Sequence, residues 1–258
     1  MPLFTDQMHR SIEITEKPQR IISLVPSQTE LLVDLGLEDR LVGVTKFCVH
    51  PKGLKKRKTI IGGTKNFHFD KIDALKPDLI IGNKEENFQE GIEKLSKNYP
   101  VWMSDIFNLE DAFQMMREIG LITGTSGQAE ALVQKIRGDM DFISLRKGTA
   151  VYLIWKNPLM TAGKNTFIDD MLQRAGFENL IHQPRYPELS PDELKAMAPD
   201  FLLLSSEPYP FRQKHMDEFA ELLPKAKVLL VDGEMFSWYG SRLRYFKDYV
   251  NNMKKYSR

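Results

Sequence analysis

The chain has one cysteine, Cys48, and it stands two positions before His50 in the stretch FCVHP. On an extended segment, side chains two residues apart lie on the same face, so this thiol and imidazole can act together. Such a pair can form a nucleophile with its base, or part of a metal site. Either chemistry needs a further group to orient or complete it, and none is evident in the sequence. The pair therefore predicts the wall of a binding site in preference to a catalytic centre.

Signatures of common catalytic and phosphate-binding sites are missing from the sequence. There is no G-x-G-x-x-G, H-E-x-x-H or G-x-S-x-G motif. The segment AGKNT (162–166) differs from a phosphate loop, because Pro158 stands where the leading glycine belongs and Asn165 separates Lys164 from Thr166. The five histidines are scattered, with no pair at close metal-ligand spacing. We therefore expect no catalytic residues and no metal or cofactor held by the protein itself.

Aromatic and cationic side chains gather where predicted strands lead into loops. In the first half they are Phe47, Cys48, His50, Lys65, Phe67 and His68. In the second half they are Trp155, Lys156, Met160, Arg185, Tyr186, Phe236, Trp238, Tyr239 and Arg242. The carboxyl ends of parallel strands form the usual ligand crevice of α/β folds. We expect the aromatic rings to stack on the apolar faces of a ligand. We expect Lys65, Lys156, Arg185 and Arg242 to meet its anionic groups.

The elements that position these residues come in two similar halves. Residues 72–82 (IDALKPDLIIG) and 194–204 (LKAMAPDFLLL) each contain a helix end, a Pro-Asp step and an apolar run. Proline ends a helix, and an unbroken apolar run is typical of a parallel strand covered on both faces. The repeat predicts two α/β lobes built on the same plan.

Further strands and helices fall into the same order in each half. Strands are predicted at 20–24, 100–103, 150–155 and 227–232, and helices at 26–37 and 166–177. Ser27 and Glu30 have the spacing of a capping box, and Gly36 and Gly176 mark helix ends. Strands that alternate with helices indicate parallel sheets with right-handed crossovers.

One long amphipathic helix is predicted in the segment 123–148. Its apolar residues recur every three or four positions, at Ala129, Val133, Ile136, Met140 and Ile143. Ser126 can cap its start, and Arg146 and Lys147 suit the negative end of the helix dipole. We expect this rigid helix to join an N-terminal lobe (1–122) to a C-terminal lobe (149–258) and to limit hinge motion. The alternative is that it packs inside one lobe.

The composition excludes several classes of protein. Lys and Arg total 36 against 35 for Asp and Glu, so the formal net charge is +1 and predicts no nucleic-acid binding. One cysteine excludes an internal disulfide, and no apolar run approaches the roughly 18 residues of a membrane span. The N-terminal residues lack a basic region followed by an apolar one. The protein is therefore either cytoplasmic or exported with a signal that this sequence does not contain. Nothing points to self-association, so we expect a monomer.

Several of these segments together resemble the class III substrate-binding proteins of ABC importers, the helical-backbone metal receptors. The most specific are PQRIISLVPSQTE (18–30) and LGLEDRLVGVT (35–45). The resemblance continues through 5–10, 72–82, 157–176 and 186–200. Members of this family take up cobalamin, ferric siderophores or haem, and the cobalamin binders are closest in segment order and length.

The resemblance implies two Rossmann-like lobes on one backbone helix, with a ligand cleft between the lobes. It implies no catalysis, a metal chelate as ligand, a periplasmic or other extracytoplasmic location, and delivery to a membrane permease. In the family, an acid on each lobe engages arginines of the permease. By position these acids correspond to Asp70 and Asp192, with Glu193 as the less favoured neighbour.

Two differences from the cobalamin binders leave the ligand open. Phe47 stands where they carry a tyrosine against the corrin, and Thr64 stands where they carry a tryptophan. Trp155, Trp238 and Tyr239 add bulk. A corrinoid, a ferric siderophore and haem all remain candidate ligands. A second interpretation is a cytoplasmic enzyme, or a metal- or corrinoid-handling protein, that uses Cys48 and His50.

Overall fold

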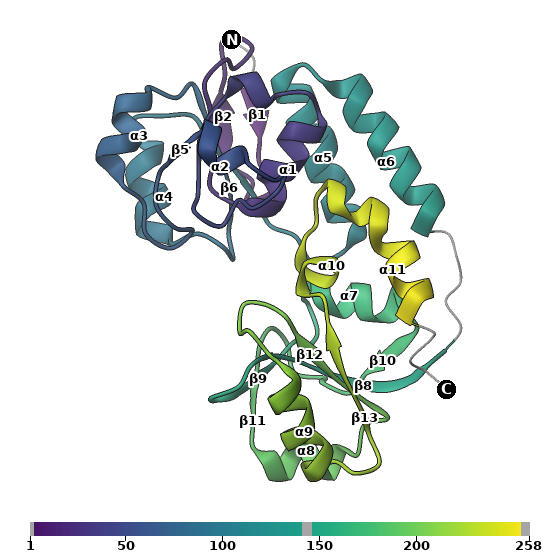
Figure 1. The fold of residues 1–258 in the computed structure, drawn as a ribbon. Helices are drawn as coiled ribbons and strands as arrows, with labels where there is room; N and C mark the ends of the chain where they lie inside the picture. Colours follow the sequence, from purple (N-terminus) through teal and green to yellow (C-terminus); the bar gives the residue numbers. More distant parts are fainter. Residues whose placement is uncertain (1–2, 141–145, 254–258) are drawn as a thin grey trace. The chain divides into compact units, whose positions relative to one another are not determined.

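The computed structural model describes residues 3–140 and 146–253, and the chain forms two compact units (Figure 1). Unit 1 consists of Met1–Ile106, Glu110–Ile136 and Tyr239–Arg242. Unit 2 consists of Phe107–Leu109, Arg137–Trp238 and Leu243–Arg258. The short segment Tyr239–Arg242 therefore groups with unit 1, although both of its sequence neighbours group with unit 2.

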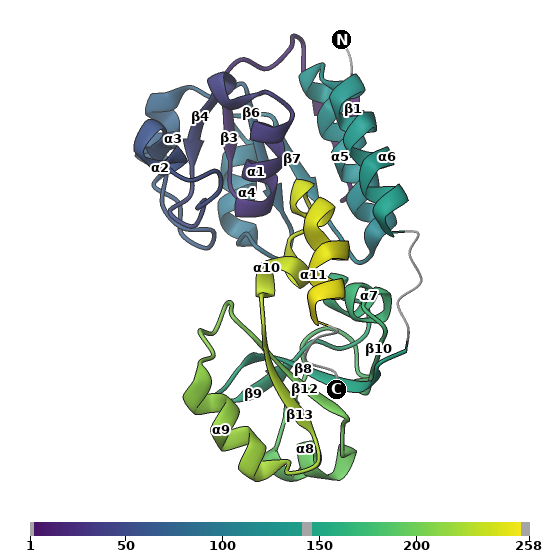
Figure 2. The ribbon, with the colours of Figure 1, turned by 45° about the vertical axis from the view of Figure 1, so that its right-hand side comes forward.

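The sheet of unit 1 is entirely parallel, as the sequence predicts for the first half (Figure 2). Its strand order is β5-β4-β3-β6-β7. The bounds are β3 (Ile21–Ser23), β4 (Leu41–Val44), β5 (Thr59–Ile60), β6 (Leu79–Asn83) and β7 (Val101–Ser104). All residues of β3 and β6 are buried, which explains their unbroken apolar runs.

Unit 1 also contains a hairpin and the helices of the first half, except that the helical residues Leu109 and 137–140 group with unit 2. The hairpin pairs β1 (Leu3–Thr5) with β2 (Ser11–Glu13). The helices are α1 (Pro26–Asp34), η1 (Glu38–Arg40), α2 (Leu54–Arg57), α3 (Phe69–Leu75), α4 (Gln89–Ser96), α5 (Leu109–Thr123) and α6 (Ser126–Met140). Helices α5 and α6 lie side by side in both views, and the Arg117–Glu130 ion pair of 2.7 Å joins them.

The sheet of unit 2 is mixed. Its order is β11-β9-β8-β12-β13, and β10 pairs with β8. The bounds are β8 (Gly148–Trp155), β9 (Leu159–Thr161), β10 (Phe177–Asn179), β11 (Glu188–Leu189), β12 (Phe201–Ser205) and β13 (Lys227–Val231). The predicted parallel strands are present, but β9 runs antiparallel to β8, and β11 runs antiparallel to β9. These two antiparallel strands add to the predicted parallel sheet, because a short turn at 156–158 sends the chain straight back beside β8.

The helices of unit 2 are α7 (Phe167–Arg174), α8 (Pro191–Met197), α9 (Gln213–Leu222), α10 (Gly233–Ser237), η2 (Ser241–Tyr245) and α11 (Phe246–Met253). Element η2 is divided between the units, because Ser241 and Arg242 group with unit 1 and its remaining residues group with unit 2. Helix α7 begins with the Thr166 hydroxyl accepting from the Asp169 amide. It ends before Gly176, whose φ of +89° is left-handed.

The Pro-Asp repeat has the same structural role in both units. In unit 1 the Asp78 carboxylate accepts from the backbone amides of Gln19 (2.7 Å) and Arg20 (2.8 Å), just before β3. In unit 2 the Asp200 carboxylate accepts from the backbone amide (2.8 Å) and the hydroxyl (2.9 Å) of Thr149, in β8. Each aspartate therefore fixes the start of its own strand to the neighbouring central strand, which confirms the predicted repeat.

The prediction of a capping box at the start of the first helix is wrong. Helix α1 begins after Val25, with Pro26 in its first turn and no side-chain cap, so Ser27 and Glu30 form no capping box. Glu30 is instead bound by a distant arginine, a contact that local spacing cannot reveal. A capping box does form at α8, where Ser190 and Glu193 bond to each other's backbone amides.

The helix predicted within 123–148 is present as α6, which is described from Ser126 to Met140. After residues 141–145, which lie outside the described ranges, Lys147 donates its backbone amide to the Gly176 carbonyl on the way into β8. Ala129, Val133, Ile136 and Met140 are buried as the stripe predicts, while Ile143 lies outside the described residues. The linking role of this helix, and the lobe boundaries at 122 and 149, remain predictions.

Candidate ligand-binding site

Two loops of unit 1 come together at the carboxyl ends of β4 and β5. The Lys46 amide donates to the Gly62 carbonyl (2.9 Å), which joins the loop after β4 to the loop after β5. Gly63 lies so close to the Phe47 ring that a Cβ there would be 3.4 Å from it. Phe47 is 48% exposed and His50 is half-buried. The structure therefore presents an aromatic ring and an imidazole on one loop.

The Cys48 side chain lies in the interior, although Phe47 before it is exposed and His50 after it is half-buried. It has no exposed surface, and its sulfur is 3.1 Å from the Thr29 hydroxyl and 3.3 Å from the Thr45 hydroxyl. Burial raises the pKa of the Cys48 thiol, an effect larger than the opposing one of the two hydroxyls. Cys48 has no exposed surface, so it does not share an accessible surface with His50, as the second interpretation requires.

We predict that Cys48 is nearly inert in the folded protein. An aromatic disulfide reagent at neutral pH is expected to modify Cys48 of the folded protein at least roughly tenfold more slowly than Cys48 of the denatured protein. The reason is that the thiolate is disfavoured and the sulfur is covered in the folded protein. Stopped-flow absorbance of the released thiolate measures both rates. Rapid modification of the folded chain at pH 7 would instead support the interpretation that Cys48 acts chemically.

Lys65 and Phe67, on the loop after β5, have structural partners. The Lys65 ammonium donates to the Glu85 carbonyl (2.5 Å). Phe67 is 7% exposed and packs against the Phe88 ring, with 4.9 Å between ring centroids. Both side chains tie this loop to the segment after β6. His68 precedes α3 and is exposed.

A buried ion pair lies near His50 in unit 1. The Arg242 guanidinium donates to both carboxylate oxygens of Glu30, each at 2.9 Å, and both side chains are 10% exposed. Burial raises the pKa of Glu30, and this outweighs the lowering by Arg242 and by the nearby His50. Tyr239 and Gly240 are buried beside them, with Gly240 against the Ser27 carbonyl. Arg242 is thus committed to Glu30, a partner that the sequence did not indicate.

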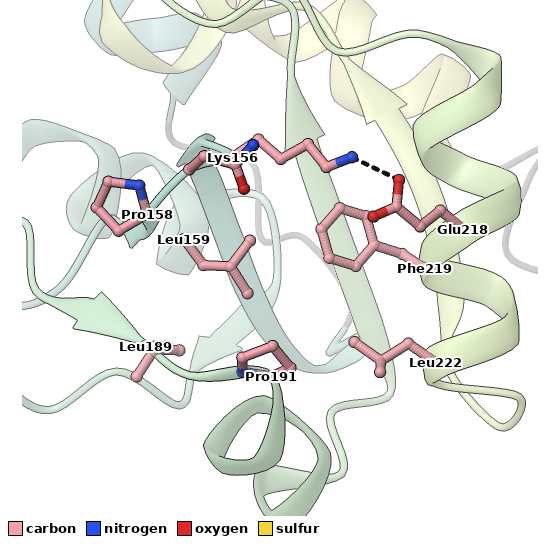
Figure 3. A pocket seen from close by; sticks show the side chains of 9 residues that line it. Lys156, Pro158, Leu159, Leu189, Pro191, Glu218, Phe219 and Leu222 are labelled. Atoms are coloured by element: carbon pink, nitrogen blue, oxygen red, sulfur yellow. Dashed lines mark hydrogen bonds and ion pairs between the residues drawn. The ribbon is translucent and has the colours of Figure 1, made fainter.

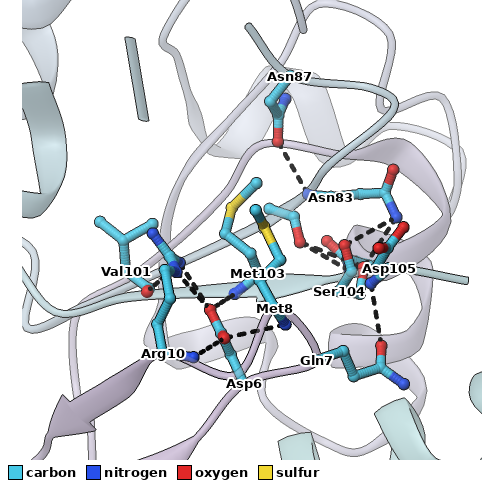
Figure 4. Close-up of polar contacts among 12 residues, drawn as sticks. Asp6, Gln7, Met8, Arg10, Asn83, Asn87, Val101, Met103, Ser104 and Asp105 are labelled. Atoms are coloured by element: carbon cyan, nitrogen blue, oxygen red, sulfur yellow. Dashed lines mark hydrogen bonds and ion pairs between the residues drawn. The ribbon is translucent and has the colours of Figure 1, made fainter. Parts of the chain in front are cut away.

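A buried polar network lies where β6 and β7 end (Figure 4). The Asn83 amide group donates to the Ser104 hydroxyl (3.0 Å), and the Gln28 amide group donates to the same hydroxyl (2.7 Å). Asn87 accepts from the Asn83 backbone amide (2.9 Å) and donates to the Thr64 carbonyl (3.0 Å). The network joins α1 to the loops after β5, β6 and β7. The polar residue that ends each apolar run, Asn83 and Ser104, was the overlooked sequence signal.

The N-terminal hairpin is fastened to the same region. The buried Asp6 carboxylate accepts from the Arg10 guanidinium (2.7 Å) and from the Met103 backbone amide (3.2 Å), as Figure 4 shows. The aspartate of the segment TDQMHR (5–10) therefore orders this turn and attaches it to β7.

Unit 2 carries a second exposed aromatic residue at a strand end. Trp155, the last residue of β8, is 39% exposed and meets the Tyr209 ring edge to face, with 5.4 Å between centroids. Met160 in β9 is half-buried and pairs with Glu188 of β11. The Arg185 guanidinium lies 5.6 Å from the rings of both Phe107 and Tyr186. Arg185 therefore has two aromatic neighbours, the adjacent Tyr186 and the distant Phe107.

The remaining aromatic candidates of unit 2 are buried. Phe236 has no exposed surface and packs against Tyr152 and Phe246. Trp238 is 7% exposed, and its indole donates to the Glu207 carboxylate (2.9 Å). Burial raises the pKa of Glu207, which also accepts from the Ser237 hydroxyl (3.0 Å). Glu207 follows β12 within two residues. The rule that ligand residues lie where strands lead into loops (the strand-end rule) would therefore have found it.

The two candidate docking acids occupy equivalent places. Asp70 lies in the first turn of α3, and Asp192 lies in the first turn of α8. Each helix ends in a left-handed residue, Lys76 or Ala198, directly before the Pro-Asp step. Both acids are exposed. Glu193 is engaged in the capping box with Ser190, which distinguishes it from Asp192.

Neither a metal cluster nor a membrane helix is found in the described part of the chain. No group of three or more His, Cys, Asp or Glu residues among 3–140 and 146–253 is arranged to hold a metal ion. Within those same ranges, no helix has both the length and the apolar character needed to cross a membrane.

Comparison with known proteins places the chain. Residues 21–223 match the family described as periplasmic binding protein. The uncharacterized ABC transporter substrate-binding lipoprotein YvrC of Bacillus subtilis (strain 168) is 25% identical over 254 residues, covering 92% of this chain and 80% of YvrC. The vitamin B12-binding protein of Pectobacterium carotovorum subsp. carotovorum (strain PC1) is 25% identical over 236 residues, covering 88% and 84%.

A solved structure agrees with these sequence relatives. The crystal structure of a possible iron-binding, periplasmic solute-binding protein from Staphylococcus epidermidis ATCC 12228 is 25% identical. It matches with a TM-score of 0.79 over 92% of this chain and 99% of that one. Since the family match spans most of the sequence and the fold agrees, this chain belongs to the periplasmic binding protein family.

Proposed function

We propose that the chain is the substrate-binding component of an ABC importer and that its ligand is a metal chelate: a corrinoid, a ferric siderophore or haem. The family and the relatives named as an ABC transporter substrate-binding lipoprotein, a vitamin B12-binding protein and a possible iron-binding protein support this proposal. The same relatives support a location outside the cytoplasm. The role is capture and delivery without chemical change.

The observation that carries the proposal is a pair of exposed aromatic residues at strand ends. Phe47 follows β4 in unit 1, and Trp155 ends β8 in unit 2, and both rings are more than a third exposed. Large exposed rings at the carboxyl edge of a sheet are typical of a ligand surface. Flat apolar faces, such as those of a tetrapyrrole, gain roughly 0.5–1.5 kcal/mol per ring beyond simple burial.

Two further residues are proposed to recognise polar parts of the ligand. His50 shares a loop with Phe47 and is partly exposed, so its imidazole is a candidate for the metal of the chelate. The Arg185 guanidinium lies 5.6 Å from two aromatic rings and is proposed to meet anionic groups of the ligand. Cys48, Phe67, Phe236 and Arg242 are assigned supporting positions in this proposal, because each is buried against protein partners.

We predict that removing either exposed ring weakens ligand binding. Phe47→Ala and Trp155→Ala should each lower affinity roughly tenfold, because stacking area is lost without loss of core packing. Intrinsic fluorescence and visible absorbance titrations with cobalamin, cobinamide, haem and a panel of ferric siderophores measure this.

The matched control is Tyr245→Ala, which removes another ring, 46% exposed, in η2 of unit 2. It should leave affinity unchanged. Equal affinity of the Phe47 and Trp155 variants and the wild type for a bound ligand would refute this assignment of the surface. Failure of every compound in the panel to bind the wild type would refute the ligand class.

The second interpretation, a cytoplasmic enzyme or metal-handling protein using Cys48 and His50, has less support. It needs the thiol and the imidazole on one accessible surface, and the Cys48 sulfur is covered. Elemental analysis of the purified protein would revive it if a transition metal were bound in stoichiometric amount.

A further inference from the structure

Unit 2 contains a pocket of about 410 Å³ whose lining includes Lys156, the residue directly after Trp155. It is lined by Lys156, Asn157, Pro158, Leu159, Leu189, Pro191, Glu218, Phe219 and Leu222. These residues come from the turn after β8, from β9 and β11, from the start of α8, and from α9 (Figure 3). A volume of this size is within the range of small-molecule sites.

The base of the pocket is the surface of the unit 2 core. Leu159, Leu189 and Phe219 are at most 9% exposed and belong to one hydrophobic cluster, against which Leu222 packs. Figure 3 shows these four side chains around one hollow, with Pro191 between Leu189 and Leu222. No polar side chain interrupts this base among the pocket residues. It is therefore suited to an alkyl chain or a small ring.

One edge of the pocket carries an ion pair of unequal partners. The Lys156 ammonium is 2.5 Å from the Glu218 carboxylate, and Figure 3 shows the pair above the apolar base. The Lys156 side chain is 19% exposed, whereas the Glu218 side chain on α9 is 55% exposed. The lysine is thus held in place by its surroundings, while the glutamate lies largely in water. An ion pair with one exposed partner contributes little stability, so another carboxylate can replace Glu218 at small cost.

Other positive charges reinforce the preference for an anion. Burial and the charges of Lys156, Lys214 and Arg212 lower the pKa of the nearby His215, with Glu218 opposing them. Lys214 and Arg212 thus add positive charge near the start of α9, on the side of the pocket that carries Lys156. Neutral His215 adds no charge of its own near pH 7.

We propose that this pocket is a second ligand site, which takes a small amphipathic carboxylate: an alkyl or aryl tail on the leucine and phenylalanine base, with its carboxylate on Lys156 in place of Glu218. The site lies wholly within unit 2 and does not depend on the identity of the transported ligand. The combination of an apolar base and one lysine on the edge favours this ligand class over a neutral apolar molecule or an amine.

Methyl-labelled full-length protein and NMR titration test the proposal, with sodium octanoate as the probe. Octanoate should shift the methyl signals of Leu159, Leu189 and Leu222. The neutral control, 1-octanol, should bind roughly tenfold more weakly, since it forms no charged contact. Hexanoate, which is two methylenes shorter, should bind roughly 15-fold more weakly than octanoate, because each buried methylene contributes about fourfold.

Three variants identify the parts of the site. Glu218→Gln should strengthen octanoate binding several-fold, because it removes the competing carboxylate. Lys156→Met should abolish the preference for octanoate over octanol, and Leu222→Trp should fill the pocket and block both. Lys84→Met, which breaks the Lys84–Asp105 ion pair of 2.6 Å in unit 1, is the matched control and should change nothing.

Several outcomes would overturn the proposal. They are equal binding of octanoate and octanol, shifts confined to other methyl groups, weaker octanoate binding in Glu218→Gln, and no shift at any concentration below micelle formation. Thermal unfolding of each variant shows whether it is folded. Because Glu218→Gln and Lys156→Met change only a rim pair, they keep the test valid even if Leu222→Trp fails to fold.

Discussion

Replacing Arg242 with Met is expected to lower the free energy of unfolding of unit 1 by about 3–5 kcal/mol, the cost of leaving a buried charge without its partner. Glu30 and Arg242 are both 10% exposed and share two hydrogen bonds of 2.9 Å. The variant leaves the Glu30 carboxylate buried in α1 without its guanidinium. Urea unfolding followed by Trp102 fluorescence, in a chain with Trp155 and Trp238 replaced by Phe, reports on unit 1.

Two comparisons separate burial from charge. Arg57→Met breaks the Arg57–Glu38 pair, which has a similar distance of 2.8 Å but lies 49% and 32% exposed, and should cost less than about 1 kcal/mol. The double variant Glu30→Met with Arg242→Met should recover most of the loss, because no charge remains buried. If Arg242→Met is no more harmful than Arg57→Met, the ion pair does not hold the segment Tyr239–Arg242 in unit 1.

The loss should also depend on pH, in a direction set by Glu30. Its pKa in the folded protein is already raised by burial, and removing Arg242 takes away an effect that lowers it. A group with a raised folded pKa contributes stability that is fully present below its unfolded pKa and is lost as pH rises through its folded pKa. The deficit of the Arg242→Met variant should therefore be smaller near pH 5 than near pH 8.

Charge reversal at both docking acids is expected to abolish uptake without changing ligand affinity. Asp70 and Asp192 occupy the first turns of equivalent helices and are exposed, which suits contacts with a basic partner. Loss of a charged interface contact costs about 2–5 kcal/mol, so Asp70→Lys or Asp192→Lys alone should slow uptake at least roughly tenfold. The effect is measured as ligand uptake by cells of the source organism in which the native gene has been replaced by each variant.

Controls for the docking prediction come from other helices. Glu90 and Asp248 are exposed acids in the first turns of α4 and α11, so Glu90→Lys and Asp248→Lys reproduce the charge change elsewhere in each unit. They should leave uptake near the wild-type rate. Normal uptake by the double variant Asp70→Lys with Asp192→Lys would refute the docking role, and reduced ligand affinity would show that the acids act through ligand binding.

Much of the fold could be predicted because its signals are local or repeated. The apolar runs of β6 and β12, each preceded by Pro-Asp, indicated buried parallel strands, and both aspartates proved to bond a neighbouring strand. Helix ends marked by Gly36 and Gly176 were also found correctly. The antiparallel strands β9 and β11 were not predicted, since β9 has three residues and β11 has two, too short for a periodic signal.

The candidate site was predicted less well, because exposure depends on contacts between distant residues. The strand-end rule located Phe47 and Trp155, which are exposed, but it equally selected Cys48 and Phe236, which have no exposed surface. Arg242 was expected to meet a ligand, and its partner Glu30 lies more than two hundred residues earlier in the chain. No local pattern relates these two, and the same holds for Gln28 and Ser104 in the polar network.

Native mass spectrometry of the purified protein mixed with each candidate chelate most directly tests whether the chain binds a ligand and leaves it unchanged. The account predicts a complex of one protein with one ligand for at least one of cobalamin, cobinamide, haem and the ferric siderophores. The ligand released from that complex should have its starting mass after prolonged incubation. A released ligand of altered mass, or no complex with any of these compounds, would contradict the account.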